Sequence, residues 1–203
     1  MAHDQTVPVS LRWQGDETGH LDILDQTRLP EALEWRSCRD VESVVESIQS
    51  LRVRGAPAIG IAGGYGLVVA AGEAARAGLA STAARAHVQA RGAVLASARP
   101  TAVNLRWAVD RCLAMLARLP AEADAAALGM ALLAEARDIH EEDRRLCAAI
   151  GDHGATILPA GGVLTHCNTG ALATGGAGTA LAVIVAAWER GTPLEVFADE
   201  TRP

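Results

Sequence analysis

The chain has 203 residues, of which half are hydrophobic and 21% are charged. This composition is typical of a sequence that folds around a core, and the length allows one or two domains. The net charge of −6 and the aromatic content of 3% argue against nucleic acid as a partner, because they favour neither a basic surface nor a stacking platform. All eighteen basic residues are arginine, which excludes Schiff-base chemistry and a P-loop lysine.

We expect neither export nor membrane insertion. The first ten residues lack a basic stretch followed by an apolar run, and the longest apolar stretches are interrupted by glycine and flanked by charged residues. The cysteines form no C-x-x-C pair, which predicts a reduced, cytoplasmic protein with no disulfide framework and no metal site. They are Cys38 in a predicted loop, Cys112 and Cys147 in predicted helix cores, and Cys167.

The N-terminal part alternates apolar and polar residues, which predicts three short strands. The alternating apolar residues are Val9, Leu11 and Trp13, then Leu21 and Ile23, then Leu33 and Trp35. Asp40 is placed to cap a helix whose apolar stripe follows it. The stripe consists of Val41, Val44, Val45, Ile48 and Leu51.

Helices dominate the middle of the sequence. Pro57 starts a predicted helix towards residue 77, and two more follow over residues 81–98 and 101–119. A long alanine-rich helix comes next, and these four are expected to pack as a bundle beside the strands. The predicted buried face of the long helix is Leu128, Leu132, Leu133, Ile139, Leu146 and Ile150. Residues 1–150 are therefore expected to form one domain.

Residues 151–203 have a different character. A short buried strand is predicted over 162–167, a glycine- and threonine-rich loop over 168–178, and a second strand over 194–198. The helix between the strands is predicted to turn Leu181, Ile184, Val185 and Trp188 inward. The fold class is thus α/β, and this β-α-β unit is expected to open a Rossmann-like parallel sheet in a second domain. Because one such unit leaves a sheet edge exposed, we expect the front part of a longer protein.

Two arginines precede predicted helix starts. Arg54 and Gly55 come just before the helix at Pro57, and Arg99 comes just before the helix at residue 101. A helix N-terminus offers free amides and partial positive charge, so a nearby guanidinium suits a phosphate or a carboxylate. The same residues also fit an ordinary turn and a solvated arginine. Four glycines in the helix after Arg54 indicate that another backbone or a ligand comes close.

Cys167 lies at the carboxyl end of a predicted parallel strand, where open α/β sheets bind their ligands. Amides of the following loop would lower its pKa and make it an acid, a base or a nucleophile; the alternative is a small buried core residue. His166 is expected to lie in the core or behind the site. Asp199 and Glu200 end the next strand and fit either sugar hydroxyls or a polar turn. The loop contains no G-x-G-x-x-G, so a dinucleotide site has little support.

Taken in order, these segments closely resemble the S-methyl-5-thioribose-1-phosphate isomerase family of methionine salvage. The resemblance runs from about Leu11 to Pro203. The matching stretches are Arg54-Gly55-Ala56-Pro57-Ala58-Ile59-Gly60, Arg99-Pro100-Thr101-Ala102-Val103-Asn104-Leu105, His166-Cys167-Asn168-Thr169-Gly170-Ala171-Leu172-Ala173-Thr174, and Val196-Phe197-Ala198-Asp199-Glu200-Thr201-Arg202-Pro203.

The resemblance implies a cytoplasmic homodimer that isomerises 5-methylthioribose 1-phosphate to 5-methylthioribulose 1-phosphate without a nucleotide cofactor or an obligatory metal. Cys167 would be catalytic. The residues that would bind the phosphosugar are Arg54, Gly55, Ala56 and Arg99. The family's catalytic aspartate has no counterpart up to Pro203, so we expect the 203-residue chain to be inactive or nearly so.

Three readings stay open beside this one. A ribose-1,5-bisphosphate isomerase resembles the same superfamily, although the sequence shows no second cationic cluster for another phosphate. A phosphosugar- or nucleotide-sensing regulatory subunit, such as the related initiation factor subunits, has the same fold. A 5-deoxy sugar is not distinguished from the 5-methylthio sugar, and both a hydride shift and an enediol route fit.

Overall fold

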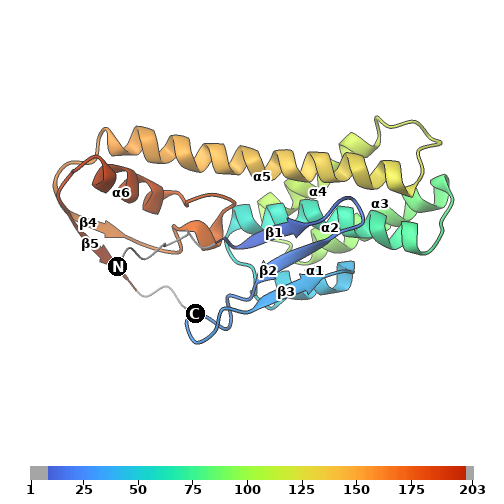
Figure 1. Ribbon diagram of the computed structural model, residues 1–203, viewed down its shortest axis with the longest axis horizontal. Coiled ribbons are helices and arrows are strands. Elements are labelled where there is room, and N and C mark those ends of the chain that lie inside the picture. The colour runs from blue at the N-terminus through green and yellow to red at the C-terminus, as the bar shows by residue number, and fades with distance from the viewer. Residues whose placement is uncertain (1–8, 200–203) are drawn as a thin grey trace.

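The computed structural model describes residues 9–199. Its N-terminal strands lie along a group of long helices, and a smaller group of elements lies at one end (Figure 1). The mixed α/β class expected from the sequence is confirmed. The predicted division at residue 150 falls inside a helix that ends at Ala155, and the two-domain organisation stays a prediction.

The first three strands form an antiparallel sheet in the order β1-β2-β3. They are β1 (Leu11–Gln14), β2 (His20–Leu24) and β3 (Trp35–Cys38). The prediction was wrong about Leu33, which precedes the third strand and is 75% exposed. The pairing explains this, because Leu24 at the end of β2 is opposite Trp35, and no β2 residue remains to pair earlier positions. Cys38 is also not in a loop: it ends β3 and is buried.

Helix α1 (Val41–Gln49) begins as predicted, because the Asp40 carboxylate accepts a hydrogen bond from the Ser43 amide. Helix α2 (Ala56–Arg76) is apolar on every side and is buried along most of its length. Among the described residues it alone has the length and hydropathy of a membrane span, but 89% of that window is buried inside the protein, as expected for a core helix.

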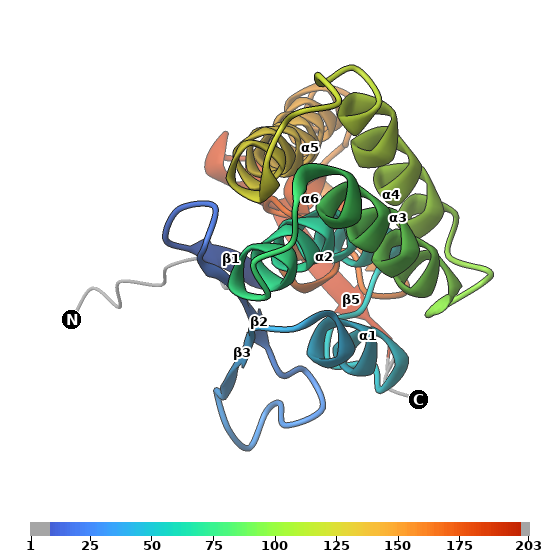
Figure 2. The same ribbon diagram turned by 90° about the vertical axis from the view of Figure 1, so that its right-hand side faces the viewer.

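Three helices pack around α2, which confirms the predicted bundle (Figure 2). They are α3 (Ser81–Ser97), α4 (Val103–Leu116) and α5 (Ala125–Ala155). Glycine lets α4 approach α2 closely: a Cβ on Gly60 would lie 2.9 Å from the carbonyl oxygen of Asn104. The expected close approach of another backbone is therefore confirmed at Gly60. A Cβ on Gly63 or Gly66 would first meet a side chain, that of Leu105 or Leu95.

The predicted buried face of α5 is correct in its first half only. Leu146 is 62% exposed and Ile150 is exposed as well. Past residue 143 the inner side of α5 contacts the glycine-rich segment (residues 170–178) and α6 through small residues, Cys147 and Gly151 among them. The larger side chains on this half of the helix are left at the surface for that reason.

The elements at the end of the molecule form a β-α-β unit. Strands β4 (Gly161–Thr165) and β5 (Leu194–Ala198) pair in parallel, with Gly161 opposite Leu194. The chain between them contains a single 3-10 turn, η1 (Ala171–Ala173), and helix α6 (Ala180–Glu189). The order of elements predicted from the sequence is thus present.

Burial in this unit differs from the prediction. Strand β4 is not buried, since Leu164 is 75% exposed. Of the four α6 side chains expected to face inward, only Ile184 is buried, while Trp188 is 69% exposed. Leu181 and Val185 are exposed as well. Helix α6 packs on α5 through small groups instead: a Cβ on Gly151 would lie 3.0 Å from the carbonyl oxygen of Ala182.

Candidate active site

The first predicted site segment is the turn that enters α2. Arg54 and Gly55 are partly buried, and Ala56 begins the helix at the surface. Gly55 has a φ of +89°, in the region that favours glycine, and a Cβ there would lie 2.5 Å from atoms of Ala173. Within residues 9–199 no side chain caps this helix start, so the amides of Ala56 and Ala58 have no side-chain partner there.

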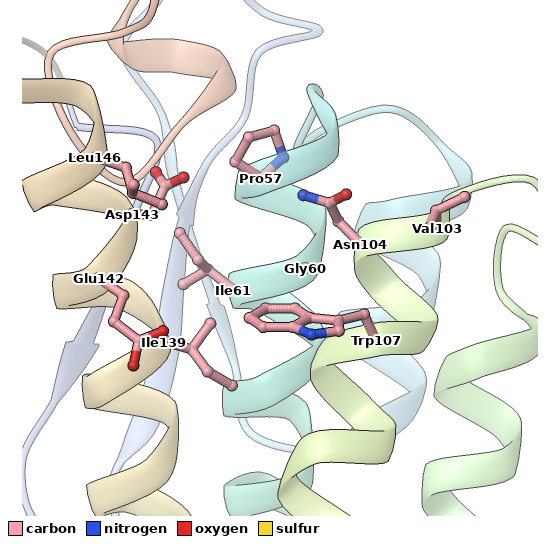
Figure 3. A pocket seen from close by; sticks show the side chains of 10 residues that line it. All are labelled: Pro57, Gly60, Ile61, Val103, Asn104, Trp107, Ile139, Glu142, Asp143 and Leu146. Carbon is pink, nitrogen blue, oxygen red and sulfur yellow. The ribbon is translucent and has the colours of Figure 1, made fainter. Parts of the chain in front are cut away.

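Helix α4 begins beside α2, and it also lacks a side-chain cap. Arg99 is partly buried in the turn that leads into it. Figure 3 shows Pro57 at the start of α2 and Val103 at the start of α4 at the same end of the two helices. Two helix N-termini, each preceded by one of the predicted arginines, are therefore neighbours. Partial positive charge adds up at this end of the bundle.

Neither of these arginines is neutralised within residues 9–199, where the side chains of Arg54 and Arg99 have no ion-pair or hydrogen-bond partner. Their neighbour Arg52 differs, because its guanidinium binds the carboxylates of Glu46 and Asp25. Two partly buried cations without an anion beside two uncapped helix starts form an arrangement that suits a phosphate.

Cys167 follows β4, outside the strand, whereas the predicted strand included it. Its φ is +68°, in the left-handed region, and it is exposed. The alternative that it is a small buried core residue is therefore wrong. The other three cysteines are buried, and burial raises the pKa of the Cys112 thiol to about 12. Within the described residues, Cys167 is the thiol that solvent reaches.

His166 does not lie in the core or behind the site, as the sequence suggested. It is exposed at the end of β4, and its Nδ1 donates a hydrogen bond to Asp199 Oδ2 across 2.5 Å. The adjacent strands β4 and β5 end at this edge, which places the two residues together. Glu200 lies outside the described residues.

The loop that follows Cys167 contacts the N-terminal part of the chain. Gln26 Nε2 donates to the carbonyl oxygen of Leu172 (2.7 Å), and Ser10 Oγ donates to that of Thr174 (2.9 Å). With the contact between Gly55 and Ala173, these bonds hold the loop against the turn that carries Arg54. The backbone segments bearing Arg54 and Cys167 are thus brought together, although no side-chain contact joins the two residues in the described structure.

A cavity of about 400 Å³ opens between α2, α4 and α5, beginning at Pro57 (Figure 3). Its lining is mainly apolar, and the Trp107 indole extends across it from α4. Both carboxylates on its wall are occupied: Glu142 binds Arg111, and Asp143 binds the amide of Gly175. The sequence did not predict this cavity, and the only pattern that could have indicated it is the glycine-rich face of α2. Within residues 9–199 no group of His, Cys, Asp and Glu is arranged to hold a metal ion.

The chain is thus a mixed α/β protein in which two helix starts preceded by arginines lie at one end of the bundle, and the loop after the exposed Cys167 contacts the first of these starts. The chain belongs to the initiation factor 2 subunit family, whose profile matches residues 52–203. The methylthioribose-1-phosphate isomerase of Alkalilimnicola ehrlichii is 50% identical to it over 197 residues, which are 96% of this chain and 54% of that protein. The resemblance found in the sequence is thereby confirmed.

Solved structures agree on the fold. The 5-methylthioribose 1-phosphate isomerase from Pyrococcus horikoshii superposes with a TM-score of 0.84 at 28% identity, over 95% of this chain and 60% of that one. The translation initiation factor eIF-2B subunit delta from A. fulgidus superposes with a TM-score of 0.82 at 39% identity, over 96% of this chain and 55% of that one. The chain spans about half the length of the curated relatives it matches.

Proposed function

We propose that this chain forms the N-terminal part of a methylthioribose-1-phosphate isomerase, which interconverts an aldose phosphate and a ketose phosphate in methionine salvage. The observation that carries the proposal is the pair of unneutralised guanidinium groups, Arg54 and Arg99, at two neighbouring helix N-termini. The phosphate of the sugar binds there, with the α2 amides after Gly55 as further donors. No nucleotide cofactor or metal takes part.

The chemistry needs an acid near the sugar ring. Because the anomeric oxygen of the substrate carries phosphate, the ring cannot open by simple loss of an anomeric proton. Cys167 is exposed at the end of β4, and its thiol protonates the ring oxygen as the C1–O bond to that oxygen breaks. Hydrogen then moves from C2 to C1, and the C2 hydroxyl returns a proton to the Cys167 thiolate as it becomes the ketone of the product.

The cavity that begins at Pro57 receives the apolar substituent on C5 of the sugar. It starts three residues after Arg54, and its floor is made of Ile61, Ile139 and Trp107. Since its two carboxylates already have partners, it offers an apolar group no competing charge. This site favours a methylthio substituent over a hydroxyl.

The parallel pair β4-β5 supports a Rossmann-like sheet that further strands extend in a protein of the relatives' length. Leu164 and Phe197 are exposed on these strands, and additional elements cover them. The complete protein is proposed to be a cytoplasmic homodimer. The chain alone binds phosphosugar but turns it over slowly or not at all, because the relatives are nearly twice as long.

A regulatory subunit that binds a phosphosugar or a nucleotide without turning it over is the second candidate. The likeness to the initiation factor subunit from A. fulgidus favours it, since that identity exceeds the one with the solved isomerase. The two candidates differ in turnover by a protein of the relatives' full length: the first requires isomerisation and the second requires binding only.

Calorimetric titration of the chain with methylthioribose 1-phosphate tests the proposal. Arg54→Ala and Arg99→Ala should each weaken binding by about 1.5–3 kcal/mol, the worth of a hydrogen bond to a charged group. Arg118→Ala is the matched control, because Arg118 is an exposed arginine that follows the opposite end of α4. Equal affinities for all three variants and the wild type would reject the site.

A further inference from the structure

The glycine-rich segment (residues 170–178) is hydrogen-bonded to α5 at Gly175, through both the carbonyl oxygen and the amide of that residue. His140 Nε2 donates to the carbonyl oxygen of Gly175 (3.2 Å), and Asp143 Oδ2 accepts from its amide (2.6 Å). His140 and Asp143 are three positions apart in α5 and so lie on the same face of the helix. Both side chains therefore bind the same residue, Gly175, from one face of α5.

The packing beneath these hydrogen bonds leaves no room for a side chain. A Cβ on Gly175 would lie 2.5 Å from His140 Cδ2 and 2.7 Å from Ile61 Cδ1. A Cβ on Gly176 would lie 2.9 Å from Cys147 Cβ. The two glycines therefore let the backbone lie directly on α5, at hydrogen-bonding distance from both side chains.

His140 is itself held in place from the other side. The Tyr65 hydroxyl lies 3.2 Å from His140 Nδ1, and the Tyr65 ring stacks on Trp13 with centroids 5.4 Å apart. Because Nε2 must donate to a carbonyl, Nδ1 accepts from the tyrosine hydroxyl, which fixes the neutral tautomer. Burial lowers the pKa of His140 and favours the same neutral form.

The anchoring of Gly175 also restrains the chain next to Cys167, because the two ends of the glycine-rich segment are joined to each other. The amide of Thr179 donates to the carbonyl oxygen of Thr169 (2.8 Å), and Gly170 pairs with Gly178. The start and the end of the glycine-rich segment are thereby joined, so fixing its middle at Gly175 also fixes the stretch that begins two residues after Cys167.

We propose that His140 and Asp143 are positioning residues that anchor the glycine-rich segment on α5 and so hold Cys167 in place beside the turn bearing Arg54. The role in positioning a catalytic thiol rests on the proposed function; the anchoring itself does not. Neither side chain needs to touch the substrate for this role.

Hydrogen exchange of the 203-residue chain, followed by mass spectrometry, tests the anchoring. In Asp143→Ala and His140→Ala, the peptide over residues 168–179 should exchange about tenfold faster, because each substitution removes a bond that anchors the segment to α5. Asp143→Asn keeps an oxygen acceptor and His140→Gln keeps a nitrogen donor, so both should stay within about threefold of the wild type. Peptides from α2 should not change.

Unchanged exchange in the alanine variants, or equal acceleration in the conservative variants, overturns the anchoring. Reaction of all four cysteines with iodoacetamide would reveal a variant that fails to fold, because three of them are buried in the native protein. In that case Tyr65→Phe replaces it: this variant removes only the hydroxyl that supports His140, and it should speed exchange of the segment a few-fold.

A second measurement separates positioning from the proposed function. Methylthioribose 1-phosphate should slow alkylation of Cys167 by iodoacetamide in the wild type at least about fivefold. At a ligand concentration well above Kd the site is occupied and the bound sugar covers the thiol. The alanine variants should lose most of this protection while they retain affinity for the ligand. Equal protection in wild type and variants overturns the positioning role. No protection in the wild type overturns the proposed function and that role with it, even where exchange confirms the anchoring.

Discussion

Gly55 and Ala173 lie in direct contact, although 118 positions separate them in the sequence. Gly55 is the N-terminal cap of α2, and Ala173 belongs to η1, which follows Cys167. A Cβ on Gly55 would lie 2.5 Å from the Cα, the Cβ and the carbonyl oxygen of Ala173. This contact sets the distance between the two loops that carry the candidate site.

Replacement of Gly55 by alanine should therefore lower the stability of the fold for two separate reasons. The φ of +89° is unfavourable for alanine, at about 1–2 kcal/mol, and the added methyl group overlaps backbone atoms, at about 1–3 kcal/mol. The free energy of unfolding from urea denaturation should fall by about 2–5 kcal/mol.

Gly78→Ala is the matched control for this prediction. Gly78 also has a positive φ, +64°, but nothing lies within 4 Å of a Cβ built there. Its replacement should cost only the backbone part, about 1 kcal/mol. Equal losses of stability in the two variants would show that the contact with Ala173 is not tight.

The buried phenol of Tyr65 should make the fold sensitive to alkaline pH. Burial raises the pKa of Tyr65 to about 12, whereas an exposed tyrosine ionises at about 10. Between these values the unfolded chain releases a proton that the folded chain retains, so stability should fall as pH rises from about 10 to 12. Below pH 10 the ionisation of Tyr65 should not affect how the free energy of unfolding depends on pH.

Tyr65 is the single tyrosine in the sequence, and the chain has no lysine, so its titration can be followed alone by phenolate absorbance. The absorbance midpoint should lie well above 10 in the folded protein and near 10 in urea. Tyr65→Phe should make the decline in stability over that pH range smaller but not abolish it, because the buried Cys112 thiol, whose pKa is also raised to about 12, contributes as well. A midpoint near 10 in the folded state would contradict the burial of this side chain.

The sequence predicted the elements well where local signals determine them. The cap at Asp40, the proline at position 57 and the alternation around Leu21 and Ile23 each specify a boundary or a face within a few residues. Burial of α6 was predicted wrongly because helical periodicity identifies an apolar face but not its partner. Trp188 lies on that face, yet the surface of α5 that α6 meets is shaped by Gly151 and admits only small groups.

The site residues that came from motifs differ in kind from those that only the structure reveals. Arg54 precedes Gly55 and Arg99 precedes Pro100 at helix starts, and Cys167 ends a predicted strand, so local sequence patterns identify all three. His140 and Asp143 lie within a long alanine-rich helix, and their partner Gly175 is more than thirty residues away. No local pattern predicts such a contact, because tertiary packing creates it.

Trp107 should affect the apolar end of the bound sugar and leave its phosphate unaffected. Its indole lines the cavity proposed for the C5 substituent, and it is about half exposed, so its loss should be tolerated by the fold. In calorimetry, Trp107→Ala should weaken binding of methylthioribose 1-phosphate about tenfold, in keeping with 1–3 kcal/mol for one apolar group in a pocket. Trp107→Phe should recover part of this loss.

Inorganic phosphate and 5-deoxyribose 1-phosphate serve as comparison ligands. Phosphate should bind Trp107→Ala as it binds the wild type, since the proposed phosphate site consists of the helix starts and the arginines and does not include the cavity. The 5-deoxy sugar should lose less affinity than the methylthio sugar, because it has a smaller apolar substituent. Loss of phosphate binding in this variant would show that the cavity binds the anion and not the substituent on C5 of the sugar.

Cys167→Ser should separate catalysis from binding in a protein of the relatives' full length. A hydroxyl is a far weaker acid than a thiol, so protonation of the ring oxygen should slow and kcat should fall about 10²–10⁴-fold, the range for loss of a general acid. The Kd for methylthioribose 1-phosphate should stay within about threefold, because the proposal assigns the affinity to Arg54 and Arg99 and not to the thiol. Arg54→Ala should show the opposite balance, with a larger change in Kd. A serine variant that retains the wild-type kcat would remove Cys167 from the chemistry and leave the anion site as the only function supported by this end of the bundle.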